Sequence, residues 1–324
     1  MPPTSYRIVF FGTSDFSVPI LEKLHALQAF DVIEVITQPD RPVGRHKILN
    51  ESPVKRVAGT RGIPVFQPED LRSPETVAHL KALDADAFVV VSYGKILPKA
   101  ILDLPKSGAI NVHASFLPKY RGASPVAGAI IAGEKVTGVT IMLMDEKMDE
   151  GPILAFSEDV PIAPHETRQS LREMLQRAAA DMIGPTLMEY LGGRIVPKPQ
   201  DHTKATRTPI LKREDGHIDW HASCEEIDRK IRGFYPWPGT YAIWERDGIP
   251  LRLVIKKAEI AHPGASCTLD GHPGRVSRAS DGSLSVNCGA GCLTVTLLQM
   301  QGKKEVSGRE FLNGYPGIAH QTLA

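Results

Sequence analysis

The chain has 324 residues, of which 42% are hydrophobic and 23% are charged, which is the composition of a globular protein and not of a fibrous or disordered one. This length exceeds what one ordinary hydrophobic core supports, so we expect two domains. The formal net charge of +1 excludes a positive field over the whole surface, and a nucleic-acid partner would have to be held by local basic patches.

The first two hundred residues alternate between strand and helix patterns. The expected strands are apolar runs without alternation, at 6–12, 31–37, 87–94, 108–115 and 137–144. Helices are expected at 16–27, 124–133 and 166–191, with a loop rich in Pro, Gly and charge at 38–53. Strands without alternation are buried on both faces, so the pattern predicts an α/β domain with a doubly wound, mostly parallel (Rossmann-like) sheet.

The character of the chain changes after residue 191. Residues 192–207 are polar, contain Pro and show no period, so we expect a linker. One helix is expected at 223–233, and short β segments between Gly turns follow at 240–244, 251–260, 274–279, 283–288 and 293–300. This spacing predicts a small β-barrel or sandwich. The predicted organisation is an α/β domain at 1–191, a linker at 192–207 and a β domain at 208–324.

Two further features bear on the cellular setting. No stretch approaches the roughly 20 apolar residues that a membrane helix needs, and the N-terminal pattern is not that of a signal peptide, so we expect a cytoplasmic protein. Four cysteines do not form a disulfide framework in a chain of this length, and their spacing offers no zinc ligand set. We therefore expect reduced thiols and no metal.

Two polar residues, Asn111 and His113, follow the apolar start of the expected strand 108–115. Side chains two positions apart on a strand point the same way, so both face one cavity at the carboxyl end of the sheet, where ligands bind in such folds. An Asn amide can donate to an oxygen that gains negative charge, and a His can transfer a proton near neutral pH. The loop after strand 137–144 offers four acids that could orient the His, and spacing does not choose among them: Asp145, Glu146, Asp149 and Glu150.

The stretches "NVHASFLPKYRGASP" and "GVTIMLMDEKMDEGPIL" together resemble the formyltransferases that use a formyl-tetrahydrofolate donor. That family pairs Asn-x-His with an Asp followed by x-Gly, and Asp149 is the matching acid. The resemblance implies that an amine attacks the formyl carbon of 10-formyltetrahydrofolate. Asn111 would then donate to the oxyanion, and His113, held by Asp149, would manage the protons.

The resemblance also implies a folate site. The family's Ser-Leu-Leu-Pro segment corresponds to Ser115, Phe116, Leu117 and Pro118, and Phe116 is a departure that keeps the wall apolar. The stretch "SYGKILP" resembles the family's pocket loop and places Tyr93 there, although an ordinary strand-to-helix turn has the same pattern.

Two stretches bear on the acceptor of the formyl group. "TQPDRPVGRHKILNESPVKR" resembles the tRNA-contacting loop of the family members that formylate methionyl-tRNA, with "GRHKI" in place of their usual "GRGKK". This implies that Arg41, Arg45 and Lys47 contact tRNA. "FFGTSDFSVP" places Phe16 where the family has a Phe near the aminoacyl group, and a core Phe at a helix start fits this stretch equally well.

The second domain carries the same resemblance. "KREDGHIDW", "IRGFYPWPGTYA" and "QGKKEVSGREFLNG" are similar to the C-terminal domain of those members, an OB-like barrel suited to nucleic-acid backbones. The implied reaction moves the formyl group of 10-formyltetrahydrofolate to the free amino group of methionine on initiator methionyl-tRNA, for translation initiation. No obligate protein partner is indicated, so we expect a monomer.

Four other functions compete with this one. An amino-sugar-nucleotide formyltransferase shares the Asn-His-Asp set and a barrel with "PWPG" but lacks the basic loop. A formyl-folate hydrolase would use water in place of the amine, and a non-catalytic RNA-binding protein would not need an intact Asn-His-Asp set. A dinucleotide-dependent dehydrogenase is disfavoured, because "FFGTSDF" has one Gly where the phosphate-binding turn needs G-x-G-x-x-G.

Overall fold

The computed structural model describes residues 5–43, 48–261 and 271–324. The chain forms two compact units, each built from more than one segment. The first unit consists of Met1–Pro125, Val136–Pro161 and Arg172–Thr208. The second consists of Val126–Lys135, Ile162–Leu171 and Pro209–Ala324.

The first unit is an α/β structure. Its strands are β1 (Tyr6–Gly12), β2 (Phe30–Ile36), β3 (Arg41–Val43), β4 (Ile48–Asn50), β5 (Val65–Phe66), β6 (Ala87–Val91), β7 (Ala109–His113), β8 (Arg121–Gly122), β9 (Val136–Thr137), β10 (Thr140–Leu143), β11 (Ile153–Phe156), β12 (Val160–Pro161) and β13 (Arg207–Thr208). Its helices are α1 (Val18–Ala26), α2 (Pro53–Thr60), α3 (Pro74–Ala82), α4 (Lys99–Leu102) and most of α6 (Arg168–Leu191). Short 3₁₀ turns lie at Asp15–Ser17 and His202–Lys204.

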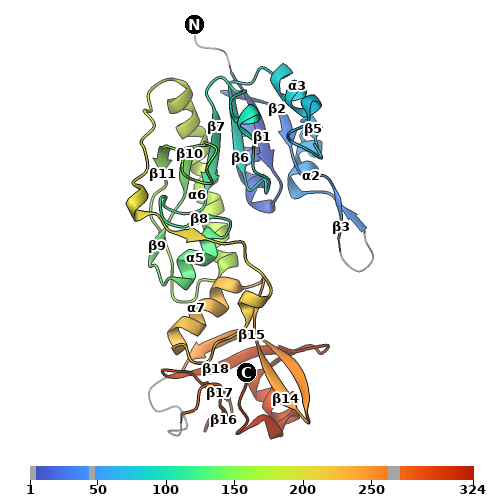
Figure 1. Ribbon diagram of the computed structural model, residues 1–324, viewed down its shortest axis with the longest axis vertical. Coiled ribbons are helices and arrows are strands. Elements are labelled where there is room, and N and C mark those ends of the chain that lie inside the picture. The colour runs from blue at the N-terminus through green and yellow to red at the C-terminus, as the bar shows by residue number, and fades with distance from the viewer. Residues whose placement is uncertain (1–4, 44–47, 262–270) are drawn as a thin grey trace. The chain divides into compact units, whose positions relative to one another are not determined.

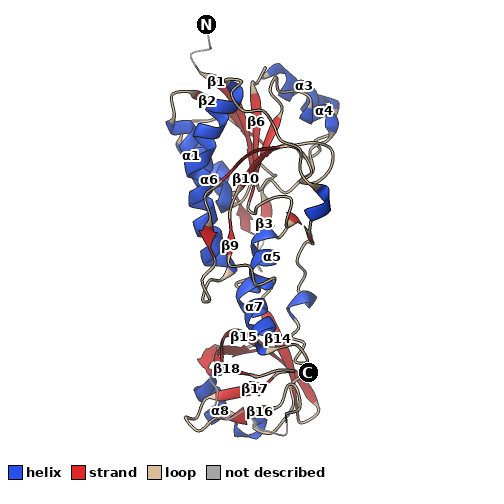
Figure 2. Cartoon of the chain, turned by 90° about the vertical axis from the view of Figure 1, so that its left-hand side faces the viewer, coloured by secondary structure: helices blue, strands red, loops and turns tan. Residues whose placement is uncertain are grey.

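Seven of these strands form one sheet in the order β11-β10-β7-β6-β1-β2-β5. The five strands from β7 to β5 are parallel, whereas β10 pairs antiparallel with both of its neighbours, β7 and β11. Figure 2 shows α1 and α6 on one side of the strands and α3 and α4 on the other. Because helices cover both faces, β6 is buried along its whole length and β1 is buried from Ile8 to Gly12, as their apolar runs require. The prediction of a doubly wound, mostly parallel sheet is confirmed.

Helices α2 and α3 were not expected from the apolar pattern. Each begins with a Ser-Pro pair, in which the Ser hydroxyl accepts the backbone N–H three residues later. Ser52 accepts from Lys55 at 3.0 Å and Ser73 accepts from Thr76 at 3.1 Å. Pro at the first helical position costs no hydrogen bond, so these pairs are good helix starts. The expected loop at 38–53 also contains the short paired strands β3 and β4, so that part of the prediction is wrong.

The second unit is mainly β. Its elements are α5 (Pro125–Ile131), α7 (Cys224–Phe234), β14 (Thr240–Arg246), β15 (Ile249–Ile260), β16 (Val276–Arg278), β17 (Leu284–Asn287), β18 (Cys292–Met300), β19 (Glu305–Ser307) and α8 (Gly308–Gly314). The strands form one antiparallel sheet in the order β14-β15-β18-β17-β16, with β19 also paired to β18. The sheet curls in Figure 1, and buried side chains of its strands belong to one apolar core. This confirms the prediction of an OB-like β domain.

Two early segments of the chain belong to this second unit. Ala127 and Ile131 of α5 pack against Leu211 and Phe234. The carbonyl of Ile131 accepts a hydrogen bond from Arg229 Nε at 3.0 Å. The carbonyl of Glu166 likewise accepts from Arg232 at 3.0 Å. The unit therefore needs residues from three separate parts of the chain.

The cysteines differ in state. Cys224 and Cys288 are free and buried, and burial raises the pKa of the Cys288 thiol to about 12. Cys292 is disulfide-bonded, so the expectation of reduced thiols is wrong for this residue. None of the described helices is both long and apolar enough to cross a membrane. Across 5–43, 48–261 and 271–324, no group of three or more His, Cys, Asp or Glu side chains is arranged to hold a metal ion.

Candidate active site

Strand β7 carries the Asn-x-His pair. Asn111 and His113 are two positions apart and share one face of the strand. The antiparallel neighbour β10 places Met142 opposite Asn111 and Thr140 opposite His113. The His113 side chain is only 7% exposed, so its surroundings are fixed by protein groups more than by water.

Asp149 joins this pair from the loop that follows β10. Its Oδ1 lies 3.3 Å from the amide nitrogen of Asn111 and 3.6 Å from Nδ1 of His113. Its Oδ2 accepts the backbone N–H of Gly122 at 2.7 Å. One carboxylate therefore contacts both β7 and β8, and amide, imidazole and acid converge in one place.

The histidine ring makes a second contact through its other nitrogen. Nε2 of His113 lies 3.0 Å from the carbonyl oxygen of Tyr120. A carbonyl oxygen only accepts hydrogen bonds, so Nε2 carries a proton in this arrangement. Nδ1, which faces Asp149, is then the ring atom that can take up a further proton.

The other three acids of the loop point elsewhere. The exposed Asp145 accepts the N–H of Lys147 in its own turn, and Glu146 is exposed. Glu150 is paired with Arg121, at 3.5 Å, and with Arg207. Asp149 is the acid that the structure places against Asn111 and His113.

Two glycines allow the loops to come this close. A Cβ on Gly151 would lie 2.0 Å from the carbonyl oxygen of Leu143, and one on Gly122 would lie 2.3 Å from that of Thr208. Gly122 also has a φ of +105°, which L side chains rarely adopt. Glycine at these positions lets the loops after β7 and β10 pack directly on neighbouring backbone.

The predicted folate residues, which follow His113 in the chain, differ in exposure. Ser115 is fully buried, and its hydroxyl donates to the carbonyl of Lys119 at 2.8 Å. Leu117 packs with Met142 and Ile153 in an apolar cluster. Phe116 lies edge-on against the Phe156 ring, at 5.8 Å between ring centroids. Pro118 is partly buried. The assignment of these four residues to folate binding stays a prediction.

Tyr93 lies in the core of the first unit. It is 2% exposed and meets the Phe11 ring edge-on, at 5.4 Å between centroids. Its hydroxyl has no hydrogen-bond partner in the described part of the chain, and burial raises its pKa to about 12. The carbonyl of Tyr93 accepts hydrogen bonds from Thr13 and Gln38 at 2.9 and 2.8 Å.

Phe16 and the basic loop are the predicted acceptor contacts. Phe16 is 3% exposed and lies beneath Arg172, whose guanidinium carbon is 5.3 Å from the ring centroid. Arg172 also pairs with Asp15 at 2.5 Å. Burial alone would raise the pKa of the Asp15 carboxyl, but the hydrogen bond and charge of Arg172 hold it below its ordinary value.

The basic loop is described only in part. Arg41 is exposed on β3, whereas Arg45 and Lys47 lie outside the described residues. Lys55 is paired with Asp40 at 2.5 Å, and this hydrogen bond lowers the pKa of the Asp40 carboxyl. Of the described cations in this stretch, Arg41 is therefore more available to an anionic ligand than Lys55.

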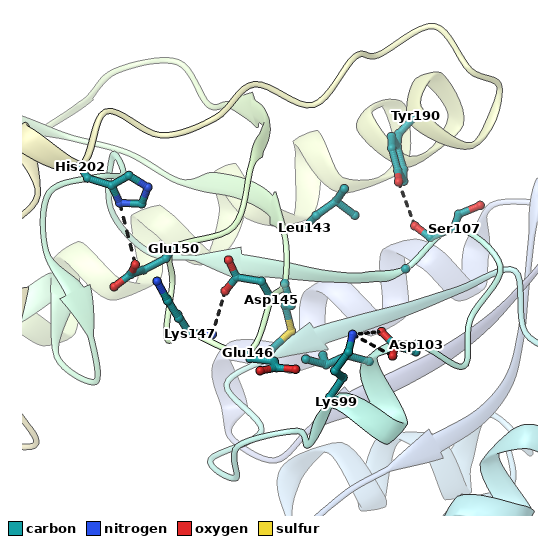
Figure 3. A pocket seen from close by; sticks show the side chains of 13 residues that line it. Lys99, Asp103, Ser107, Leu143, Asp145, Glu146, Lys147, Glu150, Tyr190 and His202 are labelled. Atoms are coloured by element: carbon teal, nitrogen blue, oxygen red, sulfur yellow. Dashed lines mark hydrogen bonds and ion pairs between the residues drawn. The ribbon is translucent and has the colours of Figure 1, made fainter.

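A cavity beside the loop that carries Asp149 does not contain the three converging side chains. It has a volume of about 670 Å³ and is lined by Lys99, Leu102, Asp103, Ser107, Gly108, Leu143, Met144, Asp145, Glu146, Lys147, Glu150, Tyr190 and His202. Figure 3 shows Asp145, Glu146 and Lys147 lining it from the loop that precedes Asp149. The loop that carries Asp149 also lines this cavity, but its lining residues include Glu150 and not Asp149.

Sequence reasoning missed two buried side chains next to the site, Arg121 and Gln200. Arg121 is 2% exposed and Gln200 is 6% exposed, and the two are hydrogen-bonded to each other. Gln200 lies in the segment that was expected to be a linker. The Arg-Gly pair in "KYRGASP" was the available signal for Arg121. The polar segment 192–207 contained no signal for Gln200.

Comparison with known proteins places the chain in a family. The family model described as formyl transferase matches residues 6–186, and the model described as formyl transferase, C-terminal domain, matches residues 210–316. Methionyl-tRNA formyltransferase of Trichlorobacter lovleyi is 42% identical over 313 residues, which is 97% of this chain and 95% of the relative. That of Chloroflexus aurantiacus is 44% identical over 309 residues, 95% of this chain and 96% of the relative.

Solved structures share the fold at low identity. WlaRD, a sugar 3N-formyl transferase crystallised with dTDP and 5-N-formyl-THF, has a TM-score of 0.63 at 15% identity, covering 93% of this chain and 100% of that one. HypX from Aquifex aeolicus in complex with tetrahydrofolic acid has a TM-score of 0.59 at 15% identity, covering 95% of this chain and 47% of that one. With both family models matched and curated relatives above 40% identity over almost the whole length, this chain belongs to the formyl transferase family and is an enzyme of that class.

Proposed function

We propose that this enzyme transfers the formyl group of 10-formyltetrahydrofolate to the free amino group of methionine on initiator methionyl-tRNA, giving the N-formylated initiator for translation. The observation that carries the proposal is the convergence of Asn111, His113 and Asp149 in a chain whose curated relatives are named methionyl-tRNA formyltransferases. The chemistry is an acyl transfer in which a C–N bond to the amine forms and the C–N bond to the folate breaks.

In this mechanism Asn111 stabilises the oxyanion. Its amide carries two protons, and the contact with Asp149 Oδ1 occupies one of them. The Asp149 carboxylate sets the orientation of the Asn111 amide, because the amide oxygen would be repelled if it faced the carboxylate in place of the nitrogen. The second N–H then donates to the formyl oxygen as it gains negative charge.

His113 moves the proton that the attacking amine must lose. Nδ1 takes that proton, because Nε2 is held by the carbonyl of Tyr120. The imidazolium formed in this step is stabilised by the Asp149 carboxylate 3.6 Å away. The same proton then passes to the folate nitrogen as the formyl group leaves, so the protons balance over the reaction. Both donor and acceptor are supplied as substrates.

The acceptor part of the proposal is supported by a basic pocket in the second unit. It has a volume of about 420 Å³ and is lined by Arg213, Pro238, Arg252, Val254, Gln299, Met300, Gln301 and Gly302, without a carboxylate. The guanidinium carbon of Arg252 lies 3.4 Å from the centroid of the Tyr241 ring. Its Nε is buried and has no hydrogen-bond partner in the described part of the chain. A cation stacked on an aromatic ring suits a nucleic-acid phosphate or base.

This role of Arg252 leads to a prediction about salt. Arg252→Gln should weaken use of the tRNA acceptor and reduce the slope of log KM for tRNA against log salt by about one, since one phosphate contact is lost. The KM for the folate donor should stay constant. The matched control is Arg278→Gln, because Arg278 is exposed and bonded to Asn313. Equal salt slopes for wild type and Arg252→Gln would contradict the phosphate contact.

The test of the function is a formyl-transfer assay with the purified chain and 10-formyltetrahydrofolate. The acceptors are charged initiator tRNA, uncharged initiator tRNA and an amino-sugar nucleotide. The proposal requires rapid transfer to the charged tRNA alone. Transfer to the sugar amine with an inert aminoacyl-tRNA would assign the chain to the sugar-nucleotide enzymes, and formate release without any amine would make it a hydrolase.

A further inference from the structure

Gln200 is a buried side chain with every polar atom satisfied. Its Nε2 donates to the carbonyl of Asp149 at 2.9 Å and to that of Gly151 at 2.7 Å. Its Oε1 accepts from Nε and from a terminal nitrogen of Arg121, at 3.1 and 2.7 Å. A primary amide has two donors and one oxygen with two lone pairs, so these four bonds use its full capacity. No other side chain type of this size can donate to two carbonyls and accept from a guanidinium.

The carbonyls that Gln200 holds lie on either side of Glu150, in the loop that carries Asp149. Asp149 has a φ of +58°, which is in the left-handed region that non-glycine residues rarely adopt. A residue keeps such a conformation only when its surroundings hold it there. The hydrogen bond from Gln200 to the Asp149 carbonyl is one such restraint, and it acts on the residue whose side chain faces Asn111 and His113.

Arg121, the other partner of Gln200, lies between two residues that contact the converging side chains. The residue before it, Tyr120, offers its carbonyl to His113 at 3.0 Å. The residue after it, Gly122, donates its N–H to Asp149 at 2.7 Å. A side chain that holds Arg121 therefore holds both contacts. The Gln200 amide therefore connects residues 120–122 to the Asp149 loop through a single side chain.

The charge of Arg121 is balanced inside the same cluster. Its side chain is 3% exposed, and its guanidinium lies 3.5 Å from the carboxylate of Glu150. It also lies 3.0 Å from Nδ1 of His202. Because a buried cation without a partner is very costly, Glu150 and Arg121 depend on each other. The anion next to Asp149 in sequence is thus drawn toward Arg121 and away from the reacting groups.

The segment that carries Gln200 is itself fixed to the sheet. Lys198 exchanges two backbone hydrogen bonds with Ile153, at 2.8 and 2.9 Å. Farther along, β13 pairs in parallel with β8, placing Arg207 beside Arg121. Gln200 lies between these two attachments, so its position relative to both loops is set by backbone pairing.

We propose that Gln200 is a positioning residue for the formyl transfer, acting with Arg121 to hold the Asp149 loop and the 120–122 segment at the separation that the reaction needs. The proposal rests on the function proposed above. The hydrogen bonds of Gln200 go to Arg121 and to the carbonyls of Asp149 and Gly151, so its effect passes through the backbone of Asp149 and through Arg121. Misplacing a reacting group by about 1 Å costs on the order of a hundredfold in rate, which sets the scale of the effect.

The test compares Gln200→Met and Gln200→Glu with wild type. Met keeps the volume and loses all four hydrogen bonds, whereas Glu keeps an acceptor for Arg121 and loses both donors to the carbonyls. We expect kcat to fall about 10- to 100-fold in both variants while the KM values for folate and tRNA change less than about threefold. The control Gln169→Met, at an exposed position in α6, should behave as wild type. Near-normal kcat in Gln200→Glu would overturn the proposal, because it would mean that only the pairing with Arg121 matters.

A double-mutant cycle shows whether Gln200 acts through Asp149. In an Asp149→Asn background, Gln200→Met should lower kcat by less than about threefold, because the group it positions is already lost. The same 10- to 100-fold loss in both backgrounds would show that Gln200 acts elsewhere and would overturn the proposal. A fall in kcat that is matched by rises in both KM values and by unfolding in circular dichroism would make the residue purely structural.

One measurement does not depend on the reaction. Hydrogen exchange of peptides that cover residues 116–124 and 145–152 should be faster in Gln200→Met than in wild type, since Gly122 N–H and the loop carbonyls lose their restraint. Unchanged exchange in both peptides would overturn the positioning role. If wild type transfers no formyl group to any acceptor, the proposed function fails, and the exchange result still decides whether Gln200 holds the two segments.

Discussion

Replacing Asp149 by Asn should lower kcat by about 10³- to 10⁴-fold, while folate binding and the fold are retained. Oδ1 of the Asp149 carboxylate contacts the side chains of Asn111 and His113, and Oδ2 accepts a hydrogen bond from the Gly122 N–H. An Asn side chain of the same shape can still accept from Gly122, so the loop keeps its place. It cannot stabilise the imidazolium of His113, and its amide can present an N–H where the ring needs an anion.

The measurement is a single-turnover formyl transfer with saturating folate, together with a fluorescence titration of folate binding. Asp145→Asn is the matched control, because Asp145 is exposed in the same loop and bonds only within its own turn in the contacts described. We expect its kcat to lie within twofold of wild type. A kcat for Asp149→Asn within tenfold of wild type would remove Asp149 from the mechanism.

Asn111→Ala should lower kcat by about 10²- to 10³-fold, which is the usual cost of losing one oxyanion donor. The change removes both the N–H proposed to meet the formyl oxygen and the contact at 3.3 Å to Asp149. Because the donor acts on charge that develops only in the transition state, the KM for folate should change little.

Asn111→Asp provides the sharper comparison for this position. It keeps the side-chain shape but puts a carboxylate where negative charge develops, so its kcat should be at or below that of Asn111→Ala. Steady-state kinetics of both variants, with the KM for each substrate measured separately, decide the matter. A large rise in the folate KM with an unchanged kcat would mean that Asn111 binds the ground state and does not stabilise the oxyanion.

Much of the first unit could be predicted from local patterns. Apolar runs without alternation marked β1, β2, β6, β7 and β10 because strands covered on both faces leave few positions for polar side chains. The i, i+2 spacing of Asn111 and His113 placed both on one side of β7 for the same geometrical reason. The spacing did not decide which of the four acids in the loop after β10 contacts Asn111 and His113, because the conformation of the loop determines which side chain turns toward them. The positive φ of Asp149 is a property of the folded loop and not of its sequence.

Other parts of the site depend on contacts between distant segments. The stretch at 192–207 has no period and contains Pro, which is the pattern of a linker, and nothing local shows that Gln200 will meet carbonyls about fifty positions earlier. The burial of Phe16 depends on Arg172 from another helix, and that of Tyr93 on Phe11 and its neighbours. These environments form only when the sheet has brought the segments together, so residue type alone could not predict them.

The assembly of the second unit from three segments has a consequence for synthesis on the ribosome. Residues 126–135 and 162–171 emerge long before residues 209–324, which supply the partners of Ala127, Ile131 and Glu166. At about 5–20 residues per second, this gap lasts for several seconds. During that interval the nascent chain carries apolar side chains that have no native neighbours to cover them. The apolar side chains of the segment that becomes α5 therefore stay uncovered until residues 209–324 have been made.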